Sequence, residues 1–69
     1  MPRALARLEI YDMQGVKIKT LLQVQLPAGN YYRVWDGKDE AGQAVPEGFY
    51  FCRLRYLDNE AAGKLELLR

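Results

Sequence analysis

The 69-residue chain contains no histidine and only one cysteine, Cys52. An internal disulfide is therefore impossible, and the chain lacks the Cys pair and the His side chains from which zinc sites are usually built. A catalytic thiol would also lack its usual base, which in most enzymes is a histidine. Cys52 is accordingly expected to be a small buried hydrophobe in the middle of a strand.

The chain also lacks a marked excess of charge and a long apolar run. Ten basic residues face nine acidic ones, giving a net charge of +1, which argues against a nucleic-acid-binding protein with a basic patch. No apolar run reaches the length of a membrane span. The first residues lead directly into a β-like segment without the apolar region of a signal peptide, so we expect no targeting segment in this chain.

The short length limits the protein to one domain, so residues 1–69 are predicted to form a single domain. A chain of this size buries only about 60% of the surface that its unfolded form exposes. Its stability is therefore expected to be marginal and to depend on a small number of packed side chains.

Period-two alternation of apolar and polar residues predicts an all-β fold of about five antiparallel strands. The predicted strands cover residues 4–11, 16–22, 30–35, 48–57 and 63–69. Two adjacent leucines, Leu21 and Leu22, break the alternation and predict a bulge or a strand end there. A tight turn is predicted at 12–15, a connection at 26–29 and a polar turn at 58–63.

The same alternation predicts which side chains face the core. In the first predicted strand the core-facing residues are Ala6, Leu8 and Ile10, and the residues facing water are Arg7, Glu9 and Tyr11. In the fourth predicted strand the core-facing residues are Tyr50, Cys52, Leu54 and Tyr56. Two phenylalanines, Phe49 and Phe51, predict that the start of the opposite face is also covered. In segment 30–35 two alternatives stay open: Arg33 lies along an edge with its stem buried, or a bulge shifts the register. We expect Tyr31 and Trp35 to point inward.

The stretch Trp35–Gly48, WDGKDEAGQAVPEG, separates two predicted strands and is rich in turn residues. Asp36-Gly37 is a strong turn signal, because Gly accepts a positive φ and Asp can bond its own backbone. A second reversal is predicted at Ala41-Gly42, and Gly48 predicts a bulge or a close backbone approach. The stretch is therefore predicted to be a long ordered corner, with Trp35 anchoring its start.

This corner and the strand after it resemble the FlgD-type immunoglobulin-like domain family of the flagellar hook-capping protein, and also the C-terminal sorting domains of bacterial secreted proteins. The matching residues are Trp35, Asp36, Gly37, Asp39, Gly42, Val45, Gly48, Tyr50, Arg53 and Leu54. The resemblance implies a small immunoglobulin-like β-sandwich. It also implies structural roles for Trp35, Asp36, Gly37, Gly42, Gly48, Tyr50 and Leu54, with Tyr50 as a candidate for a tyrosine-corner hydrogen bond.

The resemblance further implies a non-enzymatic module of a bacterial surface, secreted or flagellar protein, acting in capping, sorting or protein–protein contact. Members of the family usually carry one or two more strands before this point, so the domain is expected to be truncated at its N-terminus. An edge or a core face would then stay uncovered. We expect the upstream parent chain, a second copy in a homodimer formed by strand exchange or edge pairing, or a partner strand to supply the missing layer, without nucleic acid or a membrane span.

The alternative function is a carbohydrate- or calcium-binding accessory domain. Four acids of the corner offer oxygen ligands, namely Asp36, Asp39, Glu40 and Glu47, but they lack the regular spacing of a calcium loop. Asp36 with Asp39 or Glu47 could form a carboxylate pair only if the small domain had a cleft for a substrate. We therefore expect no catalytic residue, cofactor or metal, and turn formation accounts for Asp36.

Outward aromatic and basic side chains are the candidate interaction residues. Tyr11 and Tyr32 are candidates for stacking on sugars, although aromatic residues of small domains more often form core or cross-strand pairs. A candidate docking patch for an acidic partner consists of Arg53, Arg55, Lys64 and Arg69, for which a solvated face is the simpler interpretation. Of these residues, Tyr11, Tyr32, Arg53 and Arg55 are the predicted interaction residues.

Overall fold

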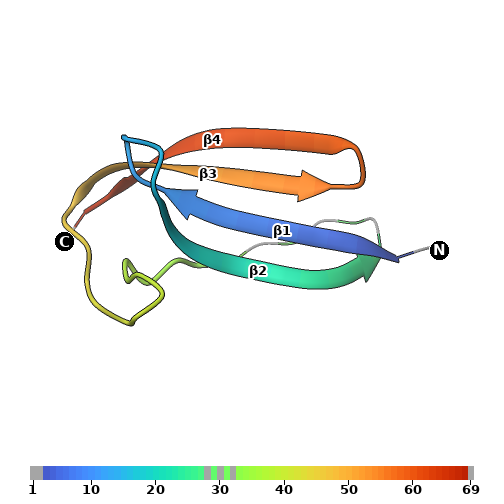
Figure 1. Cartoon of the computed structure of the whole chain (residues 1–69), viewed down its shortest axis with the longest axis horizontal. Coiled ribbons are helices and arrows are strands. Elements are labelled where there is room, and N and C mark those ends of the chain that lie inside the picture. The colour runs from blue at the N-terminus through green and yellow to red at the C-terminus, as the bar shows by residue number, and fades with distance from the viewer. Residues whose placement is uncertain (1–2, 28, 30, 32, 69) are drawn as a thin grey trace.

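The computed structural model describes residues 3–27, 29, 31 and 33–68, in which every regular element is a strand. The strands are β1 (Arg3–Tyr11), β2 (Lys17–Pro27), β3 (Gly48–Tyr56) and β4 (Asn59–Leu67). They form one antiparallel sheet in the order β2-β1-β3-β4 (Figure 1). The predicted all-β class is confirmed, with four strands among the described residues where about five were expected.

A tight turn joins β1 to β2 where the sequence predicts it. The Asp12 side chain organises this turn, because its Oδ1 accepts hydrogen bonds from the Gln14 and Val16 amides, both at 2.9 Å. Gly15 has φ of +88°, a conformation that glycine adopts without a Cβ clash. Its amide donates to the Asp12 carbonyl at 3.0 Å. The carboxylate and the glycine together account for the sharp reversal of the chain.

The pairing of β2 with β1 contains the predicted bulge. Leu8 pairs with Leu22 and Glu9 with Thr20, so Leu21 is an extra residue on β2. Beyond the bulge, β2 continues to Pro27, whereas the sequence predicts a strand end at residue 22 and a connection at 26–29. The strand is longer because β1 extends alongside it as a pairing partner.

The hairpin between β3 and β4 is tighter than predicted. Tyr56 pairs with Asn59, which leaves Leu57 and Asp58 as a two-residue loop instead of a polar turn over 58–63. Leu57 has φ of +57°, the positive value required at the first loop position of tight hairpin turns. The first residues of β4 are polar or small and lack the alternation of a strand, so the sequence predicts a strand only from residue 63. In the structure they pair with β3 from residue 59 onward.

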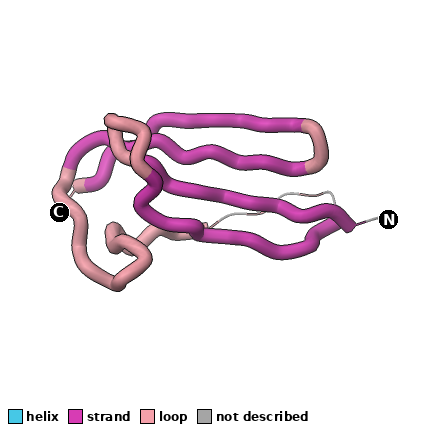
Figure 2. Tube along the Cα trace, viewed as in Figure 1, coloured by secondary structure: helices cyan, strands magenta, loops and turns pink. Residues whose placement is uncertain are grey.

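The described residues of the segment predicted as a strand over residues 30–35 form no strand. Tyr31 and residues 33–35 lie outside the strands, whereas Asn30 and Tyr32 fall outside the described residues. Tyr31 and Arg33 border a groove on one face of the sheet, and the chain then runs on as a loop to the corner (Figure 2). A strand needs a neighbouring strand for its backbone ladder, and the described residues of this segment pair with none of the four strands. Tyr31 is half exposed and Trp35 is partly buried.

The sheet has an apolar face and a charged face. The apolar face is formed mainly by Ala6, Leu8, Ile10, Leu22, Leu26, Tyr50, Cys52, Leu54 and Tyr56. Among the described hydrophobic residues, only three are buried, namely Ala6, Ile10 and Tyr50. Cys52 is partly rather than fully buried. The core is thus small: Ile10 and Tyr50 lie where the corner folds against the sheet, and Ala6 lies further along β1.

The charged face carries Arg7, Glu9, Tyr11, Arg53, Arg55 and Glu60. Phe49 and Phe51 are 46% and 37% exposed on this side, so the prediction that they are covered is wrong. Nothing among the described residues packs over the charged face as the corner packs over the apolar face.

Candidate functional site

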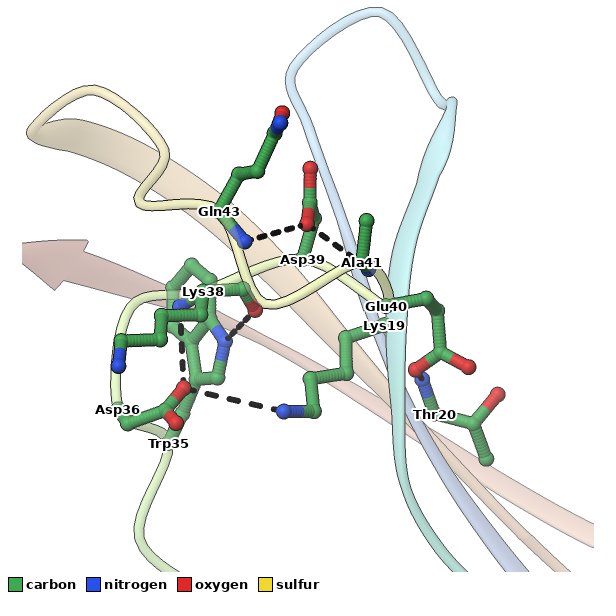
Figure 3. Close-up of polar contacts among 9 residues, drawn as sticks. All are labelled: Lys19, Thr20, Trp35, Asp36, Lys38, Asp39, Glu40, Ala41 and Gln43. Atoms are coloured by element: carbon green, nitrogen blue, oxygen red, sulfur yellow. Dashed lines mark hydrogen bonds and ion pairs between the residues drawn. The ribbon is translucent and has the colours of Figure 1, made fainter.

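The corner Trp35–Gly48 is ordered by its own side chains. Asp39 Oδ1 accepts hydrogen bonds from the Ala41 and Gln43 amides, both at 3.0 Å (Figure 3). The Gly42 amide donates to the Asp39 carbonyl at 3.0 Å, and Gly42 has φ of +80°. This is the hydrogen-bond pattern of the turn at Asp12. The sequence pattern D-x-x-G therefore encodes the same turn twice in this chain.

The Asp36-Gly37 turn forms the first half of the corner. Asp36 Oδ1 accepts a hydrogen bond from the Lys38 amide at 3.0 Å and lies 3.8 Å from Lys19 Nζ on β2. Gly37 is buried and has φ of +76°. Its carbonyl accepts from the Val45 amide at 3.0 Å. The turn residue Asp36 thus also attaches the corner to the sheet.

The corner covers part of the free edge of β2. The Glu40 amide donates to the Ile18 carbonyl at 3.2 Å. The Thr20 amide donates to Glu40 Oε1 at 3.0 Å, and these two residues lie side by side in Figure 3. A sheet edge exposes unpaired backbone groups that can pair with other chains. Glu40 therefore blocks this part of the edge with both its backbone and its carboxylate.

Two aromatic residues hold the corner against the apolar face. The Trp35 indole meets the Tyr50 ring edge to face, with centroids 5.1 Å apart and planes at 74°, and its Nε1 donates to the Lys38 carbonyl at 2.9 Å. Tyr50 is only 6% exposed, and its hydroxyl donates to the Pro46 carbonyl four residues upstream. This bond has the form expected of a tyrosine corner. Gly48, with φ of +144°, starts β3 directly before it.

Three acids of the corner accept hydrogen bonds from backbone amides, two of them within the turns and one at the edge of β2. Asp36, Asp39 and Glu40 each accept a backbone hydrogen bond. In the part of the chain that the structure describes, no group of three or more His, Cys, Asp and Glu side chains could hold a metal ion. The arrangement therefore gives the calcium alternative no support.

An apolar groove of about 430 Å³ lies open on the apolar face. Its floor and walls are formed by Ala6, Leu8, Leu22, Leu26, Leu54 and Tyr56, with Tyr31 and Arg33 along one side. Leu54, predicted to have a structural role, is 40% exposed here. Side chains that the sequence assigns to a core thus line a surface groove.

The charged face contains a buried carboxylate that the sequence places in water. Glu9 is only 5% exposed, because it lies on β1 between two neighbouring strands. The Tyr11 hydroxyl donates to Glu9 Oε1 at 2.9 Å, and Lys17 Nζ lies 3.6 Å from Oε2. Arg53 donates to the Tyr11 hydroxyl at 3.2 Å and lies 5.1 Å above its ring. The Tyr11 ring therefore contacts Arg53, and its hydroxyl is hydrogen-bonded to both Glu9 and Arg53.

The predicted basic patch is divided in the structure. Arg53 and Arg55 share one carboxylate, Glu60, at 3.9 and 3.2 Å. Lys64 instead lies over the Phe49 ring at 4.5 Å, further along β4, while Arg69, like Tyr32, falls outside the described residues.

Nothing in the sequence marks Arg7 as a candidate site residue. In the structure Arg7 on β1 lies directly opposite Arg55 on β3. Alternation places Arg7 on the charged face, but only the strand register reveals this pairing of two like charges.

The family model of the FlgD Ig-like domain matches residues 2–64. The chain belongs to this family. FlgD Ig-like domains are structural, non-catalytic modules associated with the flagellar hook. The matched region takes in β1, β2, β3 and the first part of β4.

Comparisons with curated proteins and with solved structures find no match for this FlgD Ig-like domain. Among its described residues, no helix has the length and apolar character needed to cross a membrane.

The buried carboxylate is expected to make stability pH-dependent. Burial raises the pKa of Glu9, but the hydrogen bond from Tyr11 and the positive charges of Lys17 and two arginines outweigh burial and hold the pKa below its ordinary value of 4.5. A group whose pKa is lower in the folded state stabilises that state above the ordinary pKa, and this contribution is lost as the pH falls through the lowered pKa.

We therefore expect the urea unfolding midpoint to fall between about pH 6 and pH 3, and to fall less steeply in Glu9→Gln. The exposed acid Glu66 on β4 supplies the control variant, Glu66→Gln. Equal pH slopes for wild type and Glu9→Gln would contradict the expected role of the Glu9 carboxylate.

Proposed function

We propose that this FlgD Ig-like domain is a non-enzymatic structural and interaction module of a bacterial surface, secreted or flagellar protein. Its role would be capping, sorting or protein–protein contact, performed in a secreted or surface-exposed parent protein. The open apolar groove on one face of a single sheet carries this proposal. The family supports the non-enzymatic part, since its members are structural domains.

The groove supports a protein partner because a sheet normally buries its apolar face against a second layer. Here the corner covers one end of the face, where Ile10 and Tyr50 are buried. The other part, around Leu54, stays open to solvent. Concentrated apolar surface of this kind commonly marks an interaction site.

We further propose that the partner is a second copy of the chain, which completes the missing layer by self-association. In a symmetric dimer the same patch serves both partners, so two open apolar faces can cover each other. Alternative binding of calcium or carbohydrate has less support, because Asp36, Asp39 and Glu40 cap backbone groups and Tyr11 is held by Glu9 and Arg53.

Sedimentation velocity across a wide range of protein concentrations tests self-association. We expect a dimer or larger assembly whose population rises with concentration, and we expect Leu54→Gln to shift this equilibrium toward the monomer. Leu5→Gln is the matched control, because Leu5 is 41% exposed and Leu54 40%, but Leu5 is on the charged side of the sheet.

Circular dichroism of both variants would verify that each remains folded. A wild-type chain that stays monomeric at every concentration would contradict self-association through the groove. If Leu54→Gln and Leu5→Gln weakened self-association equally, the apolar face would not be the interface between the two copies.

A further inference from the structure

We propose that Arg7 and Arg55 form a binding site for an acidic side chain of a partner protein, at the notch beyond the end of β3. The inference rests on the proposed function as an interaction module and specifies the chemistry of a partner. It concerns the charged face, so it is separate from the apolar groove that self-association would cover.

The notch exists because β1 is longer than its pairing with β3. β1 begins at Arg3, but its ladder with β3 begins only at Ala6, opposite Tyr56. Residues 3–5 therefore pair with β2 alone. Figure 1 shows this end of β1 extending past the arrowhead of β3. A pocket of about 280 Å³ lies here, lined by Ala4, Leu5, Arg7, Arg55, Tyr56 and Leu57.

The two arginines are like charges at directly opposite positions of neighbouring strands. Such a pair destabilises a sheet unless something neutralises it. Arg55 shares Glu60 with Arg53, and none of the ion pairs in the described structure includes Arg7. The Arg7 Nε is buried without a hydrogen-bond partner. The positive charge of Arg7 acts on Glu9, but the ion pair of Glu9 is with Lys17. The described site thus holds more guanidinium donors than carboxylate acceptors.

A carboxylate is the group that best fits this imbalance. Guanidinium and carboxylate groups match in geometry, and their charge-assisted hydrogen bonds are among the strongest in proteins. Arg55 already forms an ion pair with a glutamate side chain of the domain, Glu60.

The surroundings favour an acidic residue within a peptide segment that also carries apolar side chains. Leu5 and Leu57 are 41% and 70% exposed at the pocket and could contact such neighbours. Residues 3–5 also have one strand edge without a β3 partner, and an extended peptide can pair with a free edge. The partner segment is therefore expected to be extended, with a glutamate or aspartate between apolar residues.

An NMR titration with a capped pentapeptide of alternating valine and glutamate tests the proposal on the whole chain. We expect saturable shifts of the Arg7 and Arg55 Nε–H signals, with binding that weakens as salt is added. Arg7→Gln and Arg55→Gln are each expected to weaken binding about tenfold, because each removes a charge-assisted hydrogen bond. Lys64→Gln changes the net charge equally and is expected to leave binding unchanged.

The spectrum of each variant reports whether it is folded. Equal binding of the peptide in which glutamine replaces glutamate would overturn the proposal, as would an Arg7→Gln variant that binds like wild type. Binding of inorganic phosphate in place of the peptide would overturn the assignment to an acidic protein segment. Sedimentation of the same samples separates this proposal from self-association through the groove. A chain that stays monomeric but still binds the peptide would refute self-association and leave the peptide site supported.

Discussion

Trp35→Ala is expected to destabilise the domain by about 3 kcal/mol, within the range observed when a packed aromatic residue is truncated. The substitution removes the edge-to-face contact with Tyr50 and the hydrogen bond from the indole to the Lys38 carbonyl. An aromatic pair contributes about 0.5–1.5 kcal/mol beyond its buried area. Without the indole, the corner would lose its aromatic anchor on the apolar face.

A domain of this size has a total unfolding free energy of roughly 3–10 kcal/mol, so a loss of about 3 kcal/mol would remove about a third of it or more. Urea denaturation followed by circular dichroism measures the loss without relying on tryptophan fluorescence. Tyr31→Ala is the control, because Tyr31 is 50% exposed and belongs to the same connecting segment. A Trp35→Ala variant as stable as Tyr31→Ala would show that the indole does not anchor the corner.

Ile10→Ala is expected to cost about 3 kcal/mol, since truncation of a buried isoleucine removes apolar contacts and leaves a cavity. Ile10 is 1% exposed and is the largest fully buried side chain among the described residues. It lies on β1, which pairs with both β2 and β3. Backbone pairing on both sides limits how far the structure can collapse into the space.

The same denaturation measurement includes two comparison variants. Ile10→Val removes one methylene and is expected to cost about 1 kcal/mol. Val16→Ala, at a turn position that is 59% exposed, is expected to leave stability nearly unchanged. A cost for Ile10→Ala no larger than that for Val16→Ala would mean that the small core contributes little to the stability of the sheet.

The two proposed binding regions share a physical origin in the single sheet. A sheet with one layer exposes both faces, and the corner covers only part of one of them. The open part of the apolar face lies around Leu54, and the charged face is basic around Arg7. We therefore expect substitutions at these two positions to affect different measurements, self-association for Leu54 and peptide binding for Arg7.

Features that depend on neighbouring residues could be predicted from the sequence. The turn at Asp12, the turn at Asp36-Gly37 and the reversal at Ala41-Gly42 all occur. In each, an aspartate side chain accepts a hydrogen bond from a backbone amide no more than four positions away. The Tyr50 hydroxyl bond to Pro46 spans the same distance. The bulge at Leu21 is also visible, since it interrupts the alternation of apolar and polar residues.

Features that depend on distant partners were decided only by the tertiary structure. Segment 30–35 has strand-like alternation, but without a neighbouring strand its described residues form none. β4 has little alternation, yet it forms a full strand because β3 lies beside it. Burial of Glu9 and the meeting of Arg7 with Arg55 follow from the register across β1 and β3. The sequence alone determined the all-β class and the turns of this FlgD Ig-like domain, because these are local; pairing between distant segments decided its strands and its candidate sites.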